Sequence, residues 1–509
     1  MHKKDKRIAP SIGLTIGLLL SYCMPCMVKA NPTYSVRSIT ITATAAIAPI
    51  TVKRYPCLRL VQWLAPTTDA TLIRRYIGLE AGADFDGPTL LAIKRRLMAL
   101  PYFSMVSITR KRVEEDSTAM LADLMIETKD RFPISVGFNL DEGPLFTLTH
   151  HNAWGYGHRL SQHFFLKKRW GYGVTYELPK LHSNYFFGGQ HYNQRGNGCG
   201  NETKSSYRFN YQNLWMGQLL AIETKEPYAP YYWITGLSGA RKRFMPAVWE
   251  TEHKANYTFI LGKVGWVADD YTTIRSVYSL HTLERLPKGG SIEILYGYQK
   301  GALNNRHYMG ISCIKNIASP TLRYLHLSCE SGTFMHKKRL EEVILKLALA
   351  YAGPPIETCN GARLFMAIDY IMGCRMPKER MLGIRRRDPE ALEPPDSKNS
   401  MQAPIHARLN VHLSSSLHMP IMVASIRFVC LGFTDFIALY NQYNALLNQT
   451  FIDSFGVGLQ LEHATMPWLA AIFKLGYNPL LGKAVPSVQF AMGHFKNKTD
   501  PKPTQVAYS

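Results

Sequence analysis

The chain has 509 residues, and 59 Lys and Arg against 37 Asp and Glu give it a formal net charge of +22 at pH 7. Hydrophobic residues make up 46% and charged residues only 19%, and Tyr and Phe are abundant. This composition excludes a disordered, collagen-like or cysteine-dense chain. The positive charge suits either nucleic acid or an anionic membrane surface, and composition alone does not choose between them.

The first 30 residues indicate a secretory signal peptide. Basic residues crowd positions 1–7, a nearly uncharged apolar run covers 8–28, and Val28 and Ala30 have the short side chains needed for cleavage after Ala30. The alternative is an N-terminal anchor helix that is not cleaved. No later run of about 18 apolar residues predicts a membrane-spanning helix. Export also argues against nucleic acid, and we expect no nucleic-acid partner.

Residues 31–131 predict a small α+β domain with the element order β-α-α-β-β. Alternating, β-branched residues predict strands at 36–44, 106–112 and 120–127. A short helix is expected at 71–78, and Asp86 is placed to cap a second helix. The apolar residues of that second helix recur at helical spacing at Leu90, Ile93, Leu97 and Leu100.

Two strings in this domain resemble the POTRA domain, the periplasmic module that precedes barrels of the BamA/TamA outer-membrane insertase superfamily. They are GLEAGADFD, from Gly78 to Asp86, and LLAIKRRLMALPYFSMV, from Leu90 to Val106. The resemblance implies that an extended client peptide can add to an open edge of the sheet. The alternative is an unrelated small α+β domain.

Residues 132–495 predict an all-β transmembrane barrel, followed by a polar C-terminal tail at 496–509. Apolar residues alternate with polar or small ones in Val343–Tyr351, Arg363–Tyr370 and Phe455–Glu462. In a membrane barrel the apolar face meets lipid and the other face lines the lumen. About 23 residues per strand and connection allow about sixteen antiparallel strands, and fourteen or eighteen also fit. The alternatives are an extracellular β-sandwich and a propeller array.

Strings in the barrel region follow one another in the order of the same superfamily. They are FTLTHHNAWGYGHRL (Phe146–Leu160), VTYELPKL (Val174–Leu181), ARLNVHL (Ala407–Leu413), FVCLGFTDF (Phe428–Phe436) and FGVGLQLEHA (Phe455–Ala464). In the first string, Asn152, Gly155 and Gly157 mark the turn of the first hairpin. The chain therefore resembles the BamA/TamA superfamily and, within it, the bacterial surface antigen group.

The resemblance also implies a loop motif inside the lumen. In the superfamily, a hydrophobic-Arg-Gly-aromatic motif folds back into the barrel, and its Arg pairs with an Asp on the barrel wall. Ile384 and Arg385 keep the first half of this motif, whereas Arg386 stands where Gly is expected. Asp435 occupies the position of the wall carboxylate, and an Arg fork suits a carboxylate in a confined site. The alternative is a solvated cluster of loop charges.

The superfamily's barrels also have a seam where the first and last strands meet. The residues predicted to line it are Ile134, Val136 and Phe138 on the first strand, and Val488, Phe490 and Phe495 on the last. Phe495 falls one residue out of phase with Val488 and Phe490. A strand edge that opens there would be costly in lipid, so an incoming strand that pairs with it is stabilised.

The resemblance implies an outer-membrane protein, with its POTRA-like domain in the periplasm, that takes part in protein insertion or translocation. Its expected partners are outer-membrane lipid, unfolded outer-membrane or secreted clients, and accessory periplasmic subunits. We expect no enzyme, cofactor or metal, because nucleophile-elbow and metal-ligand motifs are missing and the Cys residues are widely spaced. Two rival functions stay open. One is a passive channel or surface adhesin, and the other is a barrel-embedded lipid hydrolase.

Overall fold

The structure is a computed structural model, and the residues it describes fall into nineteen stretches. These are 34–46, 58–112, 120–139, 145–167, 169–181, 185–199, 204–222, 231–245, 256–275, 283–301, 305–319, 321–356, 361–376, 406–423, 426–440, 449–463, 470–479, 482–491 and 502–506. The predicted signal peptide, residues 1–30, lies outside them. No helix within these stretches is long and apolar enough to span a membrane.

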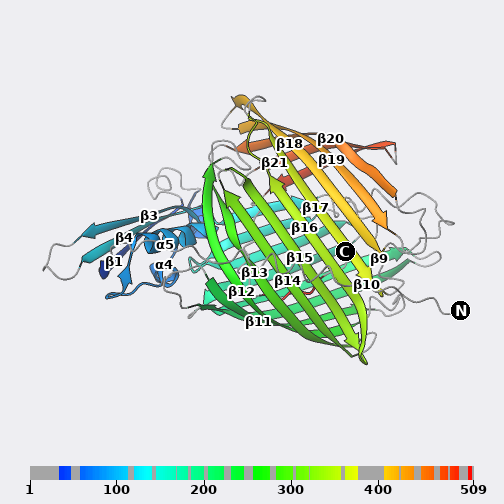
Figure 1. Ribbon diagram of the computed structural model, residues 1–509, viewed down its shortest axis with the longest axis horizontal. Helices are drawn as coiled ribbons and strands as arrows, with labels where there is room; N and C mark the ends of the chain where they lie inside the picture. The colour runs from blue at the N-terminus through cyan, green and yellow to red at the C-terminus, as the bar shows by residue number, and fades with distance from the viewer. Residues whose placement is uncertain are drawn as a thin grey trace.

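The N-terminal domain is a four-stranded sheet with helices beside it, and it lies at one end of a large barrel (Figure 1). The strands have the order β2-β1-β4-β3, and β1 runs parallel to β4. The elements are β1 (Tyr34–Thr44), α3 (Leu58–Leu64), α4 (Ala70–Ile77), β2 (Asp84–Phe85), α5 (Gly87–Ala99), β3 (Phe103–Arg112) and β4 (Leu121–Asp130). The predicted strands and two helices are confirmed, whereas α3 and the short β2 were not predicted.

The two predicted helices begin and end where their sequence signals lie. The Asp69 carboxylate caps α4 by accepting a hydrogen bond from the Thr71 N–H at 2.7 Å, and Asp86 caps α5 in the same way through Thr89. Gly78 ends α4 in the left-handed conformation, with φ of 67°. The inward faces bury Ile73, Ile77, Ile93 and Leu97 against the sheet. Full burial of each such side chain contributes about 1.5–3 kcal/mol.

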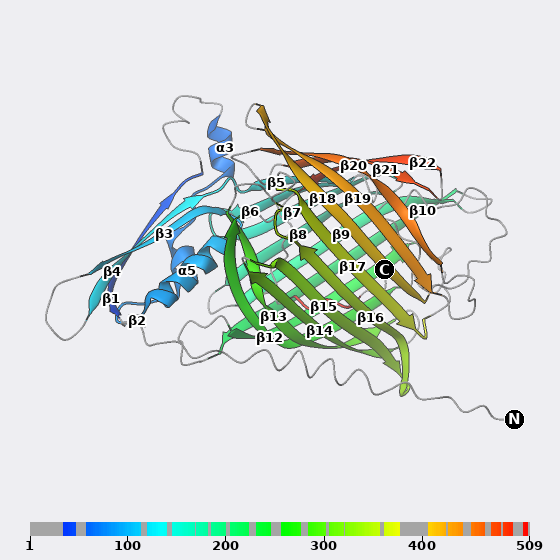
Figure 2. The same ribbon diagram turned by 45° about the horizontal axis from the view of Figure 1, so that its top comes forward.

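Within the part of the chain that the structure describes, eighteen antiparallel strands, β5 to β22, close into a barrel in chain order (Figure 2). They are β5 (Ile134–Asn139), β6 (Leu145–Ala153), β7 (His158–Lys167), β8 (Arg169–Leu181), β9 (Tyr185–Cys199), β10 (Lys204–Ala221), β11 (Tyr231–Met245), β12 (Tyr257–Arg275), β13 (Leu283–Lys300), β14 (Arg306–Ser319), β15 (Arg323–His336), β16 (Arg339–Ala352), β17 (Arg363–Cys374), β18 (Ala407–Val423), β19 (Ile426–Tyr440), β20 (Gln449–His463), β21 (Ala470–Asn478) and β22 (Lys483–Ala491). The described strands thus exceed the expected sixteen by two and match the alternative of eighteen that the length also allowed. Short connections, such as Lys337-Lys338 between β15 and β16, leave room for two more strands.

The two faces of the barrel wall differ sharply in exposure, as the alternation predicted. On β10, Met216 is 57% exposed and its neighbour Trp215 only 4%. Residues that lie directly opposite across the ladder share a face, so Leu237 and Tyr296 belong to the outer row of Met216. Trp215 belongs to the inner row, with Ser238, Leu261 and Tyr308. Outward apolar and inward mixed rows are the arrangement of a barrel that sits in lipid.

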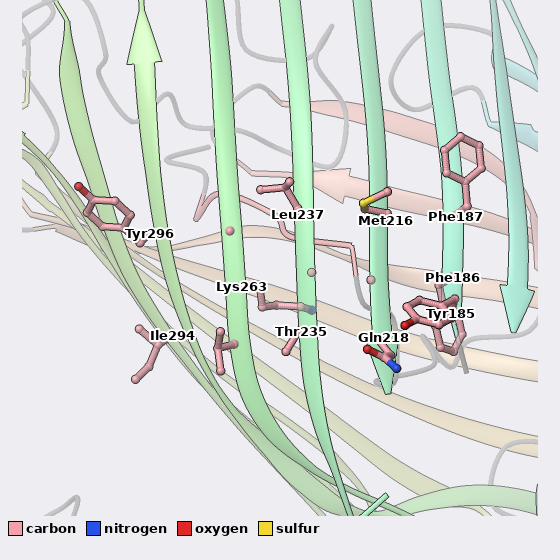
Figure 3. Close-up of a pocket in the computed structure, with 14 residues that line it drawn as sticks. Tyr185, Phe186, Phe187, Met216, Gln218, Thr235, Leu237, Lys263, Ile294 and Tyr296 are labelled. Carbon is pink, nitrogen blue, oxygen red and sulfur yellow. The ribbon is translucent and has the colours of Figure 1, made fainter. Parts of the chain in front are cut away.

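A shallow apolar groove of about 810 Å³ crosses the outer wall on strands β9 to β13 (Figure 3). Gly262 lies between Leu237 and Tyr296 in the outer row. Because glycine has no side chain, the outer surface is recessed at this position. Tyr185 and Phe187 on β9 border the other side of the groove. The groove faces the same side as the apolar row, so it is part of the surface that lipid would cover.

Candidate functional site

The two strands that close the barrel, β5 and β22, share one backbone pair among the described residues, Asn139 with Gln489. On its other side, β5 pairs all six of its residues with β6. Other neighbours pair over runs of up to eighteen residues, as β12 does with β13. Since an unpaired backbone group costs several kcal/mol in the bilayer core, this seam is the weakest described line of the wall.

Five of the six predicted seam residues lie on these two strands. They are Ile134, Val136 and Phe138 on β5, and Val488 and Phe490 on β22. The register set by Asn139 and Gln489 would bring Phe138 opposite Phe490, yet the described pairing stops before that step. Phe495 lies outside the described residues. The structure thus places the two predicted strands side by side. Among the described residues, however, no backbone pair joins the predicted seam residues themselves.

The turn between β6 and β7 joins the barrel to the N-terminal domain. Asn152 is 1% exposed, its Nδ2 donates to Thr68 Oγ1 at 2.8 Å, and its Oδ1 accepts from the Gly157 N–H at 2.6 Å. Thr68 donates through its N–H and its hydroxyl to the Asp130 carboxylate, at 2.7 and 2.9 Å. A continuous chain of hydrogen bonds therefore runs from a barrel turn to the end of β4.

The assignment of Asn152, Gly155 and Gly157 to the turn of the first hairpin is corrected by this geometry. Strands β5 and β6 form the first hairpin, and these residues belong to the second. Gly155 and Gly157 have φ of +78° and +72°, a region that residues with a Cβ adopt at a cost. A Cβ at Gly155 would lie 2.5 Å from Thr67 O, so the domain packs too closely for any side chain.

Further contacts connect the N-terminal domain to the barrel. His150 Nε2 lies 2.7 Å from Leu64 O at the end of α3, and Arg96 on α5 donates to Tyr232 OH on β11 at 2.7 Å. Burial raises the pKa of the Asp130 carboxyl, and its two hydrogen bonds from Thr68 act in the opposite direction. The N-terminal domain is therefore held to the barrel at more than one strand.

We expect Asn152→Ala to loosen this joint by about 1–3 kcal/mol, because the buried Gly157 N–H and Thr68 hydroxyl both lose a partner. A double-mutant cycle with Thr68→Val would show coupling between the two positions. Limited proteolysis of the N-terminal domain in the intact protein measures the effect. Gly239→Ala is the matched control, since a Cβ there meets nothing within 4 Å. Additive effects in the cycle would contradict a direct Asn152–Thr68 link.

Asp435 lies on the lumen side of β19, with polar partners on both neighbouring strands. Its carboxylate lies 2.6 Å from His412 Nδ1 on β18 and accepts from Ser454 Oγ on β20 at 2.9 Å. The opposite face of β20 carries Val457, which is 65% exposed. Ile384, Arg385 and Arg386 lie outside the described residues, so the predicted Arg385–Asp435 pair stays a prediction.

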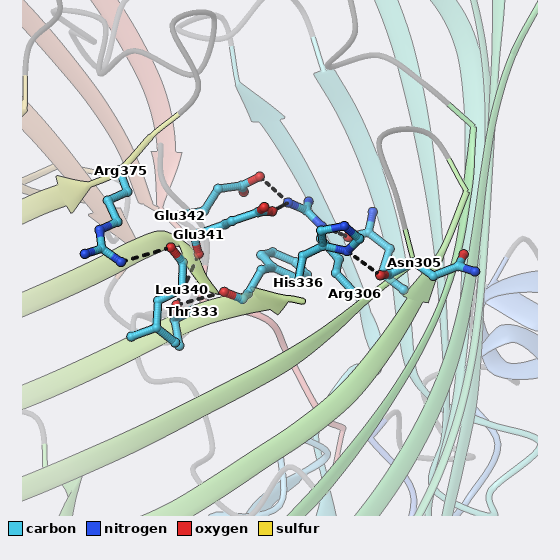
Figure 4. A network of polar contacts seen from close by, with 10 residues as sticks. Asn305, Arg306, Thr333, His336, Leu340, Glu341, Glu342 and Arg375 are labelled. Atoms are coloured by element: carbon cyan, nitrogen blue, oxygen red, sulfur yellow. Dashed lines mark hydrogen bonds and ion pairs between the residues drawn. The ribbon is translucent and has the colours of Figure 1, made fainter. Parts of the chain in front are cut away.

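A buried ion pair that was not predicted joins strands β14 and β16 of the barrel wall (Figure 4). The Arg306 side chain is 3% exposed and pairs with Glu342, which is 1% exposed, at 2.5 Å. Arg306 Nε donates to Gln299 Oε1 at 2.9 Å, and its guanidinium lies 3.7 Å from the Phe334 ring centre. The only sequence signal was a charged residue at an inward position on each of two strands that are not neighbours.

The described residues hold no group of three or more His, Cys, Asp or Glu that could bind a metal ion. No protein-family model and no curated protein sequence matches the chain. Solved structures do. BamA from Haemophilus ducreyi, in a form lacking POTRA domains 1–3, matches 89% of this chain and 84% of its own at a TM-score of 0.42 and 12% identity.

CdiB from Acinetobacter baumannii matches 94% of this chain and 96% of its own, at a TM-score of 0.37 and 9% identity. CdiB from Escherichia coli matches 95% and 98%, at a TM-score of 0.33 and 9% identity. The chain resembles BamA and CdiB. At these identities the likeness concerns the fold alone, and no residue role is carried over to this chain.

Proposed function

We propose that the chain is an outer-membrane β-barrel protein that takes part in inserting other proteins into that membrane or moving them across it. The observation that carries this proposal is the seam, where β5 pairs fully with β6 but shares one described pair with β22. A strand edge that is short of partners in lipid is stabilised when an incoming strand pairs with it. A client hairpin could therefore add at β5 as the wall opens.

The N-terminal domain supports the same proposal as a POTRA-like module in the periplasm. Strand β3 (Phe103–Arg112) is an edge of its sheet, paired with β4 on one side only among the described strands. An extended client can pair with such an edge through its main chain and with little demand on sequence. The joint around Asn152 would then hold this edge in place beside the barrel. No covalent chemistry, cofactor or metal is part of the proposed work.

Depletion of the protein in its own cells tests this proposal. If it assists insertion or translocation, other outer-membrane barrels or secreted proteins should fall in amount, and unfolded precursors should accumulate in the periplasm. Quantitative proteomics of the membrane and secreted fractions measures both. A passive channel or an adhesin would leave those amounts unchanged, and that result would overturn the proposal. Lipase activity that survives purification and is lost with one Ser substitution would favour a hydrolase instead.

A further inference from the structure

Residues 502–506, from Lys502 to Val506, lie far along the chain from the barrel wall that they contact. The Val506 N–H donates to Tyr308 OH on β14 at 2.9 Å. Lys502 Nζ donates to Gln190 Oε1 on β9 at 3.0 Å and lies 4.0 Å from the centre of the Trp215 ring on β10. Pro503 and Val506 are buried, and Val506 is only 3% exposed.

All three wall residues belong to the lumen face. Trp215, Leu261 and Tyr308 follow one inner row across the ladder and are 4%, 2% and 0% exposed. Gln190 lies opposite Asn213, which is buried in the neighbouring inner row. The Lys502–Val506 segment is therefore inside the barrel, and it spans the wall from β9 and β10 to β14.

The place that receives Val506 is shaped for a peptide. Tyr308 packs edge-on against Phe259 and Phe334, with ring centres 5.9 and 5.1 Å apart, which fixes its hydroxyl. Gly310 and Gly332 leave space around that hydroxyl, because a Cβ at either position would touch it. A phenol held rigidly against these glycines is a ready acceptor for a backbone N–H.

The place that receives Lys502 is built in a similar way. The Trp215 ring lies across Gly188, where any Cβ would collide with it, so the ring lies flat along the wall and offers its face to the lumen. An ammonium over a Trp face is held by the ring quadrupole, and Gln190 accepts one of its hydrogen bonds. The two places together hold the ammonium group and a backbone N–H of one five-residue segment.

We propose that this lumen face is a peptide-binding site and that residues 502–506 are its resident ligand. This segment plugs the lumen until another peptide displaces it. The proposal does not depend on the client role, because it concerns passage of ions and small solutes through the barrel. It commits to the chain's own tail as the occupant. A second extended peptide with a Lys four residues before an apolar residue would compete for the same site.

Ion conductance of the full-length protein in planar bilayers tests this. A variant lacking residues 502–509 should conduct several-fold more than the intact chain. Val506→Pro removes the N–H that Tyr308 accepts while the residue stays apolar, and Lys502→Met keeps the long stem without the charge. Each should raise the open fraction by a few-fold to roughly tenfold, the range expected for one lost hydrogen bond. Thr504→Ala, at an exposed position in the same segment, should match the intact chain.

A synthetic peptide of residues 502–506, capped at both ends, should lower the conductance of the shortened variant towards that of the intact chain. Heat-modifiable migration on gels shows that each variant is a folded barrel. If the shortened variant does not fold, the two single substitutions decide the matter. Conductance equal to that of the intact chain in every folded variant, or the absence of a peptide effect on a folded shortened variant, would overturn the proposal.

Discussion

A disulfide between Asn139→Cys on β5 and Gln489→Cys on β22 should abolish client insertion while the barrel stays folded in the membrane. These positions form the one described backbone pair across the seam. Residues directly opposite in an antiparallel pair have Cβ atoms about 4.5–5.5 Å apart, which a disulfide can bridge after a small adjustment. Because no other pair of described residues joins β5 to β22 in the ladder, one covalent link would hold the seam closed.

Insertion of a radiolabelled outer-membrane barrel into vesicles that hold the variant measures the effect, with and without reductant. Reductant should restore insertion. The matched control is a disulfide between Val136→Cys and Leu148→Cys, which joins β5 to β6 where the strands are already paired. That link should leave insertion unchanged. Full insertion by the oxidised seam variant would show that β5 and β22 need not separate.

Glu342→Gln should destabilise the barrel by about 3 kcal/mol, because the buried Arg306 guanidinium loses the nearer and more deeply buried of its two carboxylate partners. Arg306 and Glu342 are 3% and 1% exposed, so water does not reach either group to compensate. Glu341 lies 3.8 Å from Arg306 and is 40% exposed. Loss of the Glu341 charge in Glu341→Gln should cost no more than about 1 kcal/mol. This variant is therefore the matched control.

Replacement of both partners, as Arg306→Met with Glu342→Leu, should recover most of the loss, because two apolar side chains leave no buried charge. Urea titration of tryptophan fluorescence in detergent gives the free energies of unfolding. A double variant as unstable as Glu342→Gln would contradict this account. The pair also lies beside the proposed tail site, since Arg306 stacks on Phe334 and Phe334 packs on Tyr308.

Much of the fold follows from local patterns. Alternation along Val343–Tyr351 determines which side chains face outward, because successive residues of a strand point to opposite faces. Helix α5 begins at its cap Asp86, and α4 ends at Gly78, because these residues satisfy the end groups of a helix locally. Such signals act over a few residues and survive in any fold that uses the segment. They do not report which strands become neighbours or how many strands close the barrel.

The functional geometry depends on contacts between distant residues. Asn152 and Thr68 are 84 residues apart, Arg306 and Glu342 are 36 apart, and Val506 and Tyr308 are 198 apart. The motif strings placed Asn152 at a turn but could not show that this turn binds the N-terminal domain.

The sequence by itself determined the β-rich class, the small α+β domain before the β region, and the inward and outward faces of the strands. Only the tertiary structure decided the closure of the eighteen described strands, the seam with its one described pair, the contact between Asn152 and Thr68, and the position of residues 502–506 inside the lumen. The reason is physical, because strand register and closure are set by the sum of many pairings around the ring.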